Sequence, residues 1–283
     1  MEAPWAGQGA VFLCAVLWST SGLFFKLVNW HPVVISGLRS LIAALFMFGV
    51  RLFLTPRGGP KSKKYPLWAG AFCYAFTMLS FVIANKNTTA ANAIILQYSA
   101  PVWAAILGWL LIKEKPHWEH WAALVCVFGG LFLFFKDGIG SGAFFGDSIA
   151  LLSGVLFGAH TVYLRMQKEG SPADSMLLAH VINFTYAIPF IILYPPVFTP
   201  VSAFSIIFMG TIQLGCASLL YSYGIKRVSA VQAMLTATIE PLLNPIWVLL
   251  VIGEMPSVSA LFGGGIILAA VVISSVIGRY RDK

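Results

Sequence analysis

Long apolar runs alternate with short polar turns along the whole chain. A helix needs about 20 apolar residues to cross the hydrocarbon layer of a membrane. The turns are rich in proline, glycine and lysine, as in "TPRGGPKSKKYP" and "KDGIGSG", and proline and glycine end helices. We therefore predict ten membrane-spanning helices, near residues 7–28, 33–54, 66–85, 90–112, 118–136, 145–165, 174–194, 201–224, 229–252 and 257–278.

The composition agrees with an all-α polytopic membrane protein. Of the 283 residues, 59% are hydrophobic and only 10% are charged, whereas soluble domains are roughly a quarter charged. The first apolar run has no basic segment before it, so we expect a retained span and not a signal peptide. The four cysteines stand singly within apolar runs, without metal or redox spacing. We expect no metal, no cofactor and no disulfide.

The positive charges predict the orientation in the membrane. Lysine and arginine at the span ends divide fourteen to three between the two sides, and the richer side faces the cytoplasm. This places both termini in the cytoplasm of a protein of the cytoplasmic (inner) membrane. The "RGGPKSKK" loop is expected to contact anionic lipid headgroups of the bilayer. Nucleic acid is not an expected partner, because no basic domain with interleaved aromatic residues is present.

One stretch of the chain recurs half a chain later. Residues 99–116, "SAPVWAAILGWLLIKEKP", match residues 239–256, "IEPLLNPIWVLLVIGEMP", at an offset of 140 residues. The segment "FVIANKNTTAANA" aligns with "YSYGIKRVSAVQA" at the same offset, and the first span resembles the sixth at 139. Residues 1–140 and 141–283 are therefore predicted to be two copies of a five-helix unit.

An odd number of spans turns the second copy upside down. The lysines agree, because the "KEKP" turn carries two and its equivalent "GEMP" turn carries none. Inverted repeats are typical of secondary transporters, in which the two halves exchange conformations around a central site. The alternative reading of the duplication is a scaffold or a channel without alternating access.

These segments carry a family resemblance. The helix with "YSAP" that ends in "LLIKEKP" and is followed by "GGLFLFF", together with "SAVQAMLTATIEPLLNPIWVLLVIGEMP", resembles the EamA branch of the drug/metabolite transporter superfamily. The early "AVLWSTSGLFFK" is similar to that family's first span. The resemblance implies ten helices in two inverted halves, with spans 1, 3, 4, 6, 8 and 9 lining a central cavity. Family substrates include amino acids, nucleosides, sugars, quaternary amines and drugs, so the cargo stays open.

Glu240 is the deepest charged residue of the predicted spans. Ionisable groups in the membrane are costly and indicate function. Gln232, Thr236, Glu240 and Asn244 recur every four residues, which places them on one face of a continuous helix. The repeat-related residue of Glu240 is Ala100, so the scaffold does not need a carboxylate there. Glu240 is expected to bind a substrate ammonium or to carry a coupled proton.

Aromatic and amide side chains near mid-span complete the predicted site. Aromatic faces bind cations and stack on rings, although core packing or an interfacial belt explains any single one as well. His160 is a substrate contact or proton relay, or else a packing residue. The predicted substrate-binding residues are Trp18, Tyr74, Gln97, Tyr98, Trp103, His160, Gln213, Tyr221, Thr236, Glu240 and Asn244.

Other polar and special residues have structural readings. Arg39 and His180 fall in the peripheral spans 2 and 7, and Arg39 is expected to snorkel or pair near the outer surface. Glu114 and Glu254 are expected to neutralise cations or to cap nearby helix starts. Pro101 and Pro241 predict kinks in spans 4 and 9. The glycine runs at 129–130 and 263–265 predict close helix contacts, with a homodimer face as one use.

We predict a secondary transporter that exports a small organic solute, such as an amino acid or amine metabolite, by alternating access. No nucleotide-binding loop is present, so a gradient, with a proton as the candidate coupling ion, must supply the energy. The alternatives are a multidrug, organic-cation or nucleoside carrier of the same fold, and then a channel or an intramembrane enzyme. The sequence has no HExxH, no GxSxG and no aspartate-rich motif, so no catalytic residue is predicted.

Overall fold

The computed structural model describes residues 4–54, 62–136, 139–140, 144–253 and 257–281. Every regular element in these ranges is a helix. Nine helices of the described chain are long and apolar enough to cross a membrane. The predicted all-helical membrane class is therefore confirmed, and two shorter helices occupy the place of the ninth predicted span.

The first half of the chain contains five crossings, of which the first and the fourth are interrupted. Its helices are α1 (Pro4–Ser19), α2 (Ser21–Leu27), α3 (Pro32–Leu54), α4 (Lys64–Asn87), α5 (Ala90–Gln97), α6 (Ala100–Ile112) and α7 (Trp118–Phe135).

The second half repeats this order, with a π-helical segment, η2, inside its third crossing. Its elements are α8 (Phe144–Arg165), α9 (Pro172–Leu193), α10 (Pro200–Phe208), η2 (Met209–Cys216), α11 (Ala217–Ile225), α12 (Ala230–Ala237), α13 (Glu240–Ile252) and α14 (Val258–Arg281).

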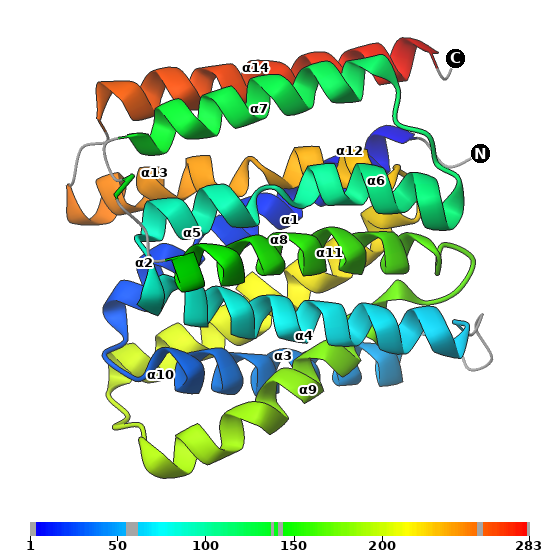
Figure 1. The fold of residues 1–283 in the computed structure, drawn as a ribbon. Coiled ribbons are helices and arrows are strands. Elements are labelled where there is room, and N and C mark those ends of the chain that lie inside the picture. The colour runs from blue at the N-terminus through cyan, green and yellow to red at the C-terminus, as the bar shows by residue number, and fades with distance from the viewer. Residues whose placement is uncertain (1–3, 55–61, 137–138, 141–143, 254–256, 282–283) are drawn as a thin grey trace.

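The two halves run in opposite senses through one bundle. The amino and carboxyl termini lie at the same end, at the right of Figure 1. The chain passes from α7 to α8 at the opposite end (Figure 1). Below, the end that holds the termini is called the terminal end, and the other is called the far end.

Spans 4 and 9 are each broken near the middle. The breaks fall at residues 98–99 and 238–239, which are the same place in the two repeats. Pro101 and Pro241 each follow at the second position of the next helix, where the missing N–H is tolerated. The predicted kinks are thus confirmed as breaks of the helix.

The two glycine runs pack against each other. α7 and α14 lie side by side (Figure 1). A Cβ atom added to Gly130 would lie 2.9 Å from the carbonyl oxygen of Gly263, and one added to Gly263 would lie even closer to that of Gly130. Gly129 and Gly265 have nothing within 4 Å. One glycine of each run is therefore used for the predicted close contact, which forms within the chain.

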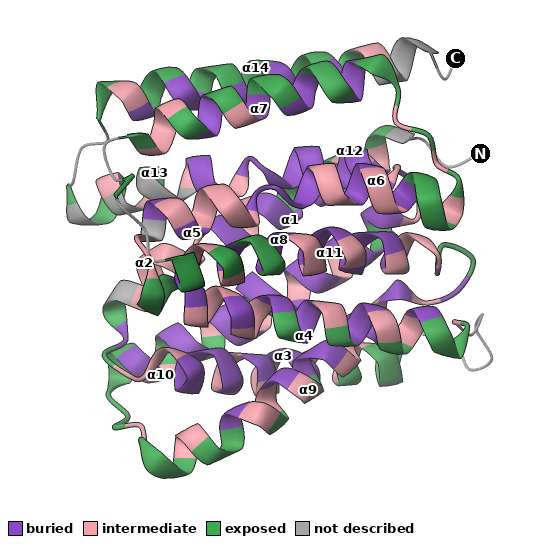
Figure 2. Ribbon diagram, in the orientation of Figure 1, coloured by how far each residue is buried: buried purple, intermediate pink, exposed green. Residues whose placement is uncertain are grey.

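Polar groups lie inside the bundle and many apolar ones lie outside it. Buried residues concentrate on α8, α11 and α12, while α7, α9 and α14 expose much of their surface (Figure 2). Large apolar side chains such as Phe53, Phe144 and Phe262 are exposed, whereas Asn183, His180 and His160 are fully buried. This distribution is that of an integral membrane protein, whose outer surface meets lipid.

Candidate functional site

A cavity of about 680 Å³ opens between the two halves. It begins in the middle of the bundle at Trp18 and Glu240, and it follows the last turns of α4 to Asn85 and Lys86. Both of these residues are exposed and lie at the far end, so the cavity opens there. Its walls come from spans 1, 3, 4, 6, 8 and 9, as the resemblance implied, together with residues of spans 2 and 5.

The breaks in spans 4 and 9 bring a carboxylate and a phenol together. Glu240 is the first residue of α13, and Tyr98 is the C-cap residue that directly follows α5. The hydroxyl of Tyr98 donates a hydrogen bond of 2.9 Å to Oε2 of Glu240. Both line the cavity. The carboxyl group of Glu240 thus faces the cavity without a bonded cation from the described chain.

The cavity also contains a guanidinium group. Arg39 of α3 lines it and donates a hydrogen bond of 3.3 Å from a terminal nitrogen to Oε1 of Gln213. The guanidinium lies 4.7 Å from the ring centroid of Phe25. Gln213 in turn donates to the backbone carbonyl of Trp18 over 3.4 Å. The expectation that Arg39 snorkels or pairs near the outer surface was therefore wrong, because span 2 packs against η2 and turns this side chain inward.

The aromatic rings of Trp18, Tyr74 and Phe157 line the inner end of the cavity, and we call these three rings the floor. The ring centroid of Trp18 lies 5.3 Å from that of Tyr221 and 6.0 Å from that of Phe157. Tyr74 stacks on His160 at 4.6 Å. The hydroxyls of Tyr221 and Thr161 share a hydrogen bond of 2.8 Å beneath this floor. These rings offer a surface for an apolar or cationic group.

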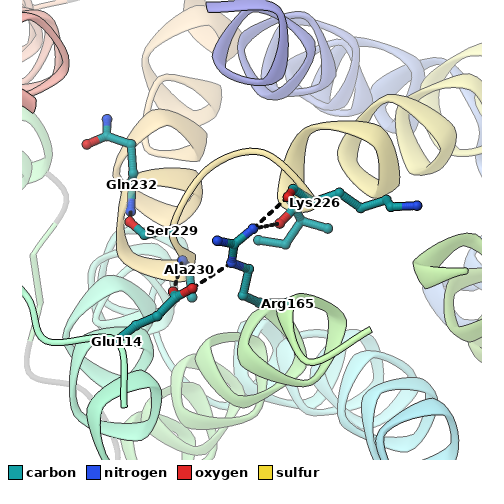
Figure 3. Close-up of polar contacts among 7 residues, drawn as sticks. Glu114, Arg165, Lys226, Ser229, Ala230 and Gln232 are labelled. Atoms are coloured by element: carbon teal, nitrogen blue, oxygen red, sulfur yellow. Dashed lines mark hydrogen bonds and ion pairs between the residues drawn. The ribbon is translucent and has the colours of Figure 1, made fainter. Parts of the chain in front are cut away.

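Below the floor, an ion pair fastens the terminal end of the bundle. Nε of Arg165 donates 2.6 Å to Oε1 of Glu114, and a terminal nitrogen donates to the carbonyls of Ile225 and Lys226 at 3.0 and 2.7 Å. Glu114 also accepts from the backbone N–H of Ala230 at 3.3 Å. Figure 3 shows Arg165 between Glu114 and the chain end of α11. We call this group the latch.

The latch confirms the predicted role of Glu114. It neutralises a cation and accepts from the first residue of α12, as predicted. Its side chain and that of Arg165 are 27% and 15% exposed, so the pair is largely shielded from water. The latch joins α6, α8, α11 and α12, which belong to both halves. Glu254, its relative in the repeat, lies outside the described residues.

A histidine outside the cavity lies beside Lys86 of the cavity mouth. Nε2 of His31 lies 2.9 Å from Nζ of Lys86, and the ring stacks on Tyr194 at 4.6 Å. Partial burial and then the positive charge of Lys86 lower the pKa of His31 below its ordinary value. The described residues hold no group of three His, Cys, Asp or Glu that could bind a metal ion.

Six of the eleven predicted site residues line this cavity. They are Trp18, Tyr74, Gln97, Tyr98, Gln213 and Glu240.

Four others lie elsewhere. Tyr221 lies under the floor, and Nδ1 of His160 bonds the carbonyl oxygen of Gly70 at 2.8 Å. Trp103 donates to Ser99, and Thr236 bonds its own helix at Gln232.

The side chain of Asn244 lies outside the described part of the structure. The expected four-residue stripe is interrupted, because the break at residues 238–239 ends α12 before Glu240. Gln232 consequently faces away from the cavity and donates to Ser275 of α14.

The inference from the sequence missed Arg39, Phe81 and Asn85 as lining residues. Arg39 carried a usable signal, since an arginine within a span is as costly as the glutamate that was selected. Phe81 and Asn85 carried none, because phenylalanine is abundant in this chain and asparagine is common at span ends.

Comparison with known proteins gives consistent results. The profile of the EamA-like transporter family matches residues 5–136 and again residues 144–276. An uncharacterized transporter of Bacillus subtilis, YwfM, is 26% identical over 277 residues, which is 95% of this chain and 93% of that protein. Solute carrier family 35 member G1 of Homo sapiens is 30% identical over 194 residues, 62% of this chain and 52% of that protein. One crystal structure superimposes with a TM-score of 0.84 at 17% identity, covering 99% of this chain and 100% of the other.

Proposed function

The chain belongs to the EamA-like transporter family, and we propose that it is a secondary active transporter for a small amine-bearing solute, such as an amino acid or amine metabolite. The observation that carries the proposal is the cavity. It reaches Glu240 at mid-bundle from the far end, while the floor and the latch close the terminal end. A solute site that is accessible from one side only is what alternating access requires.

The conformational cycle uses the two repeats. The terminal end carries the excess of lysine and arginine and would face the cytoplasm. In a protein of the inner membrane with this orientation, the cavity would open outward. Release of the latch opens the terminal end, while the equivalent spans of the other half close the far end. The proposed direction is export, in which the solute enters from the cytoplasm and leaves through the mouth at Lys86.

Glu240 has one of two roles in this cycle. It binds the ammonium group of the solute directly, or it exchanges a proton that is coupled to transport. Both roles need a carboxylate that is removed from bulk water and free of a permanent counter-cation. The hydrogen bond from Tyr98 holds one oxygen, and the other remains for the solute or the proton.

A counterflow assay in proteoliposomes tests the proposal. Vesicles loaded with an amino acid or amine should accumulate labelled solute, and replacement of Glu240→Gln should abolish this uptake or its proton coupling. Asp174→Asn is the matched control, because Asp174 pairs with Arg51 at the surface, outside the cavity. If the folded protein showed no counterflow with any solute, the proposal that it is a carrier would be contradicted. If the Glu240→Gln variant kept full proton-coupled uptake, the proposed role of Glu240 would be wrong.

An organic-cation carrier is the second candidate, and the aromatic floor beside a carboxylate favours it. Counterflow with quaternary amines but not with primary amines would support this candidate. A channel would conduct without the saturable exchange that defines a carrier.

A further inference from the structure

Arg39 lines the cavity without a bonded carboxylate from the described chain, although the charge of Glu240 acts on it through space. Within the described chain it makes no ion pair, and its bonded partners are the neutral amide of Gln213 and the ring of Phe25. Its Nε is buried and has no hydrogen-bond partner in the described structure. Placing a guanidinium inside a membrane protein is costly unless it is paired. Glu240 acts on Arg39 through space without bonding it, so a directly bonded carboxylate would have to come from outside the described chain.

Glu240, which lines the same cavity, likewise has no bonded partner of opposite charge in the described chain. Its hydrogen bond comes from the neutral phenol of Tyr98, and no lysine or arginine of the described chain forms an ion pair with it. The two groups line one cavity and attract each other across it, but no hydrogen bond or ion pair joins them in the described chain. A simple cation would pair with Glu240 and leave Arg39 unpaired, whereas a simple anion would do the reverse.

We propose that the solute is a zwitterion whose carboxylate binds Arg39 while its ammonium binds Glu240. This inference rests on the proposed function and narrows it, because it excludes amines without a carboxylate. The planar guanidinium suits a carboxylate, which it can bind through two parallel hydrogen bonds. A zwitterion adds no net charge to the cavity, and it satisfies both buried groups at once.

Gln213 is a positioning residue for Arg39. Its amide oxygen accepts from Arg39, and its amide nitrogen donates to the carbonyl of Trp18. Gln213 therefore links the guanidinium group of Arg39 to the backbone of Trp18, whose ring belongs to the floor. The apolar part of the solute would rest on Trp18 and Phe157, between the two charged anchors.

Three ligands with the same ring test the inference. Phenylalanine carries both charges, phenethylamine only the ammonium, and 3-phenylpropionate only the carboxylate. Competition against counterflow gives the apparent affinity of each for the full-length protein in liposomes. The same series with leucine, 3-methylbutylamine and 4-methylpentanoate covers an aliphatic side chain. Wild-type protein should bind the zwitterion at least about tenfold more tightly than either relative, as one charge-assisted hydrogen bond predicts.

The variants should remove this preference one charge at a time. Arg39→Gln should lower the affinity for the zwitterion about tenfold and leave that for the amine unchanged or higher. Glu240→Gln should lower it similarly without weakening the anion. Arg39→Lys keeps the positive charge but loses the planar guanidinium, so its affinity for the zwitterion should lie between those of the wild-type protein and Arg39→Gln. Asp174→Asn should leave all affinities unchanged.

Two results would overturn the inference. One is a zwitterion that binds no better than its matched amine in both series, and the other is an Arg39→Gln variant, folded by its thermal unfolding curve, that weakens all ligands equally. If amines exchange without any advantage for the zwitterion, the carrier stands and the zwitterion inference fails. If nothing in either series exchanges, the inference fails and the amine-carrier proposal fails for these solutes as well.

Discussion

Weakening the latch should shift the protein toward a state that is open at the terminal end. The change is Glu114→Gln, which keeps the shape and an oxygen that can accept from Arg165, but removes the negative charge. Arg165 would keep its bonds to the two carbonyls at the end of α11. The variant therefore tests the ion pair and leaves the rest of the packing in place.

The magnitude follows from the burial of the pair. Fully exposed ion pairs contribute about 0–1 kcal/mol, and loss of one partner of a buried pair costs about 3–5 kcal/mol. Glu114 and Arg165 are 27% and 15% exposed, so the pair lies between these limits. We expect the charge to be worth about 1.5 kcal/mol, or about a tenfold change in the ratio of closed to open terminal ends.

Cys14 is a natural reporter of this opening. It is fully buried and lies one helical turn from Trp18 toward the amino terminus. With the other three cysteines replaced, its alkylation by a water-soluble reagent from the terminal side should be about tenfold faster in Glu114→Gln. A cysteine placed at Asn85, at the mouth, should react more slowly in the same variant.

The paired reporters separate opening from unfolding. Unfolding would speed both reactions, whereas an exchange of states speeds one and slows the other. Asp174→Asn, which breaks the exposed pair with Arg51 at the same end, should change neither. Unchanged reactivity of Cys14 and of the mouth cysteine in Glu114→Gln would refute the assignment of the latch.

Three further predictions address packing, pH and orientation. Gly263→Ala should destabilise the protein by about 1–3 kcal/mol, because its Cβ would meet the backbone of α7, while Gly129→Ala should be neutral or stabilising, both read from thermal unfolding in detergent. The pKa of His31 is lower in the folded protein than its ordinary value of 6.5, so protonation of this residue favours the unfolded chain as the pH falls. The melting temperature should therefore decrease between about pH 7 and pH 5, and it should decrease less in the His31→Gln variant. Cysteines at Ser62 and after Lys283 should both be labelled from the cytoplasmic side, and labelling from opposite sides would contradict the proposed topology.

The sequence predicted the spans well because their signals are local. Apolar length sets each crossing, and proline and glycine set the turns between them, so the predicted and observed ranges agree within a few residues. The interruptions of spans 4 and 9 could also be predicted from the sequence, because Pro101 and Pro241 recur at equivalent places of the two repeats. The repeat provides a comparison within one sequence.

The wall of the site could be predicted only in part, because it depends on contacts between distant segments. Arg39 meets Gln213 across 174 residues, and no local pattern indicates that span 2 turns its arginine toward η2. Thr236 and Glu240 would share a face on a continuous helix, but the break lies between them, and of the two Glu240 lines the cavity. Glu114 was assigned the right kind of role, but its partner Arg165 lies 51 residues away.

The π-helical turn η2 gives the cavity a preferred direction. Two identical walls would offer a solute two equivalent poses, related by the pseudo-two-fold axis of the repeats. The span that contains η2 has 26 residues, and its relative α4 is a regular helix of 24. Gln213 projects from this wider turn, and the position 140 residues earlier is Cys73, which cannot orient a guanidinium. The two-fold-related pose would lack this contact, so under the proposed function a solute would travel through the bilayer with the same end leading in every cycle.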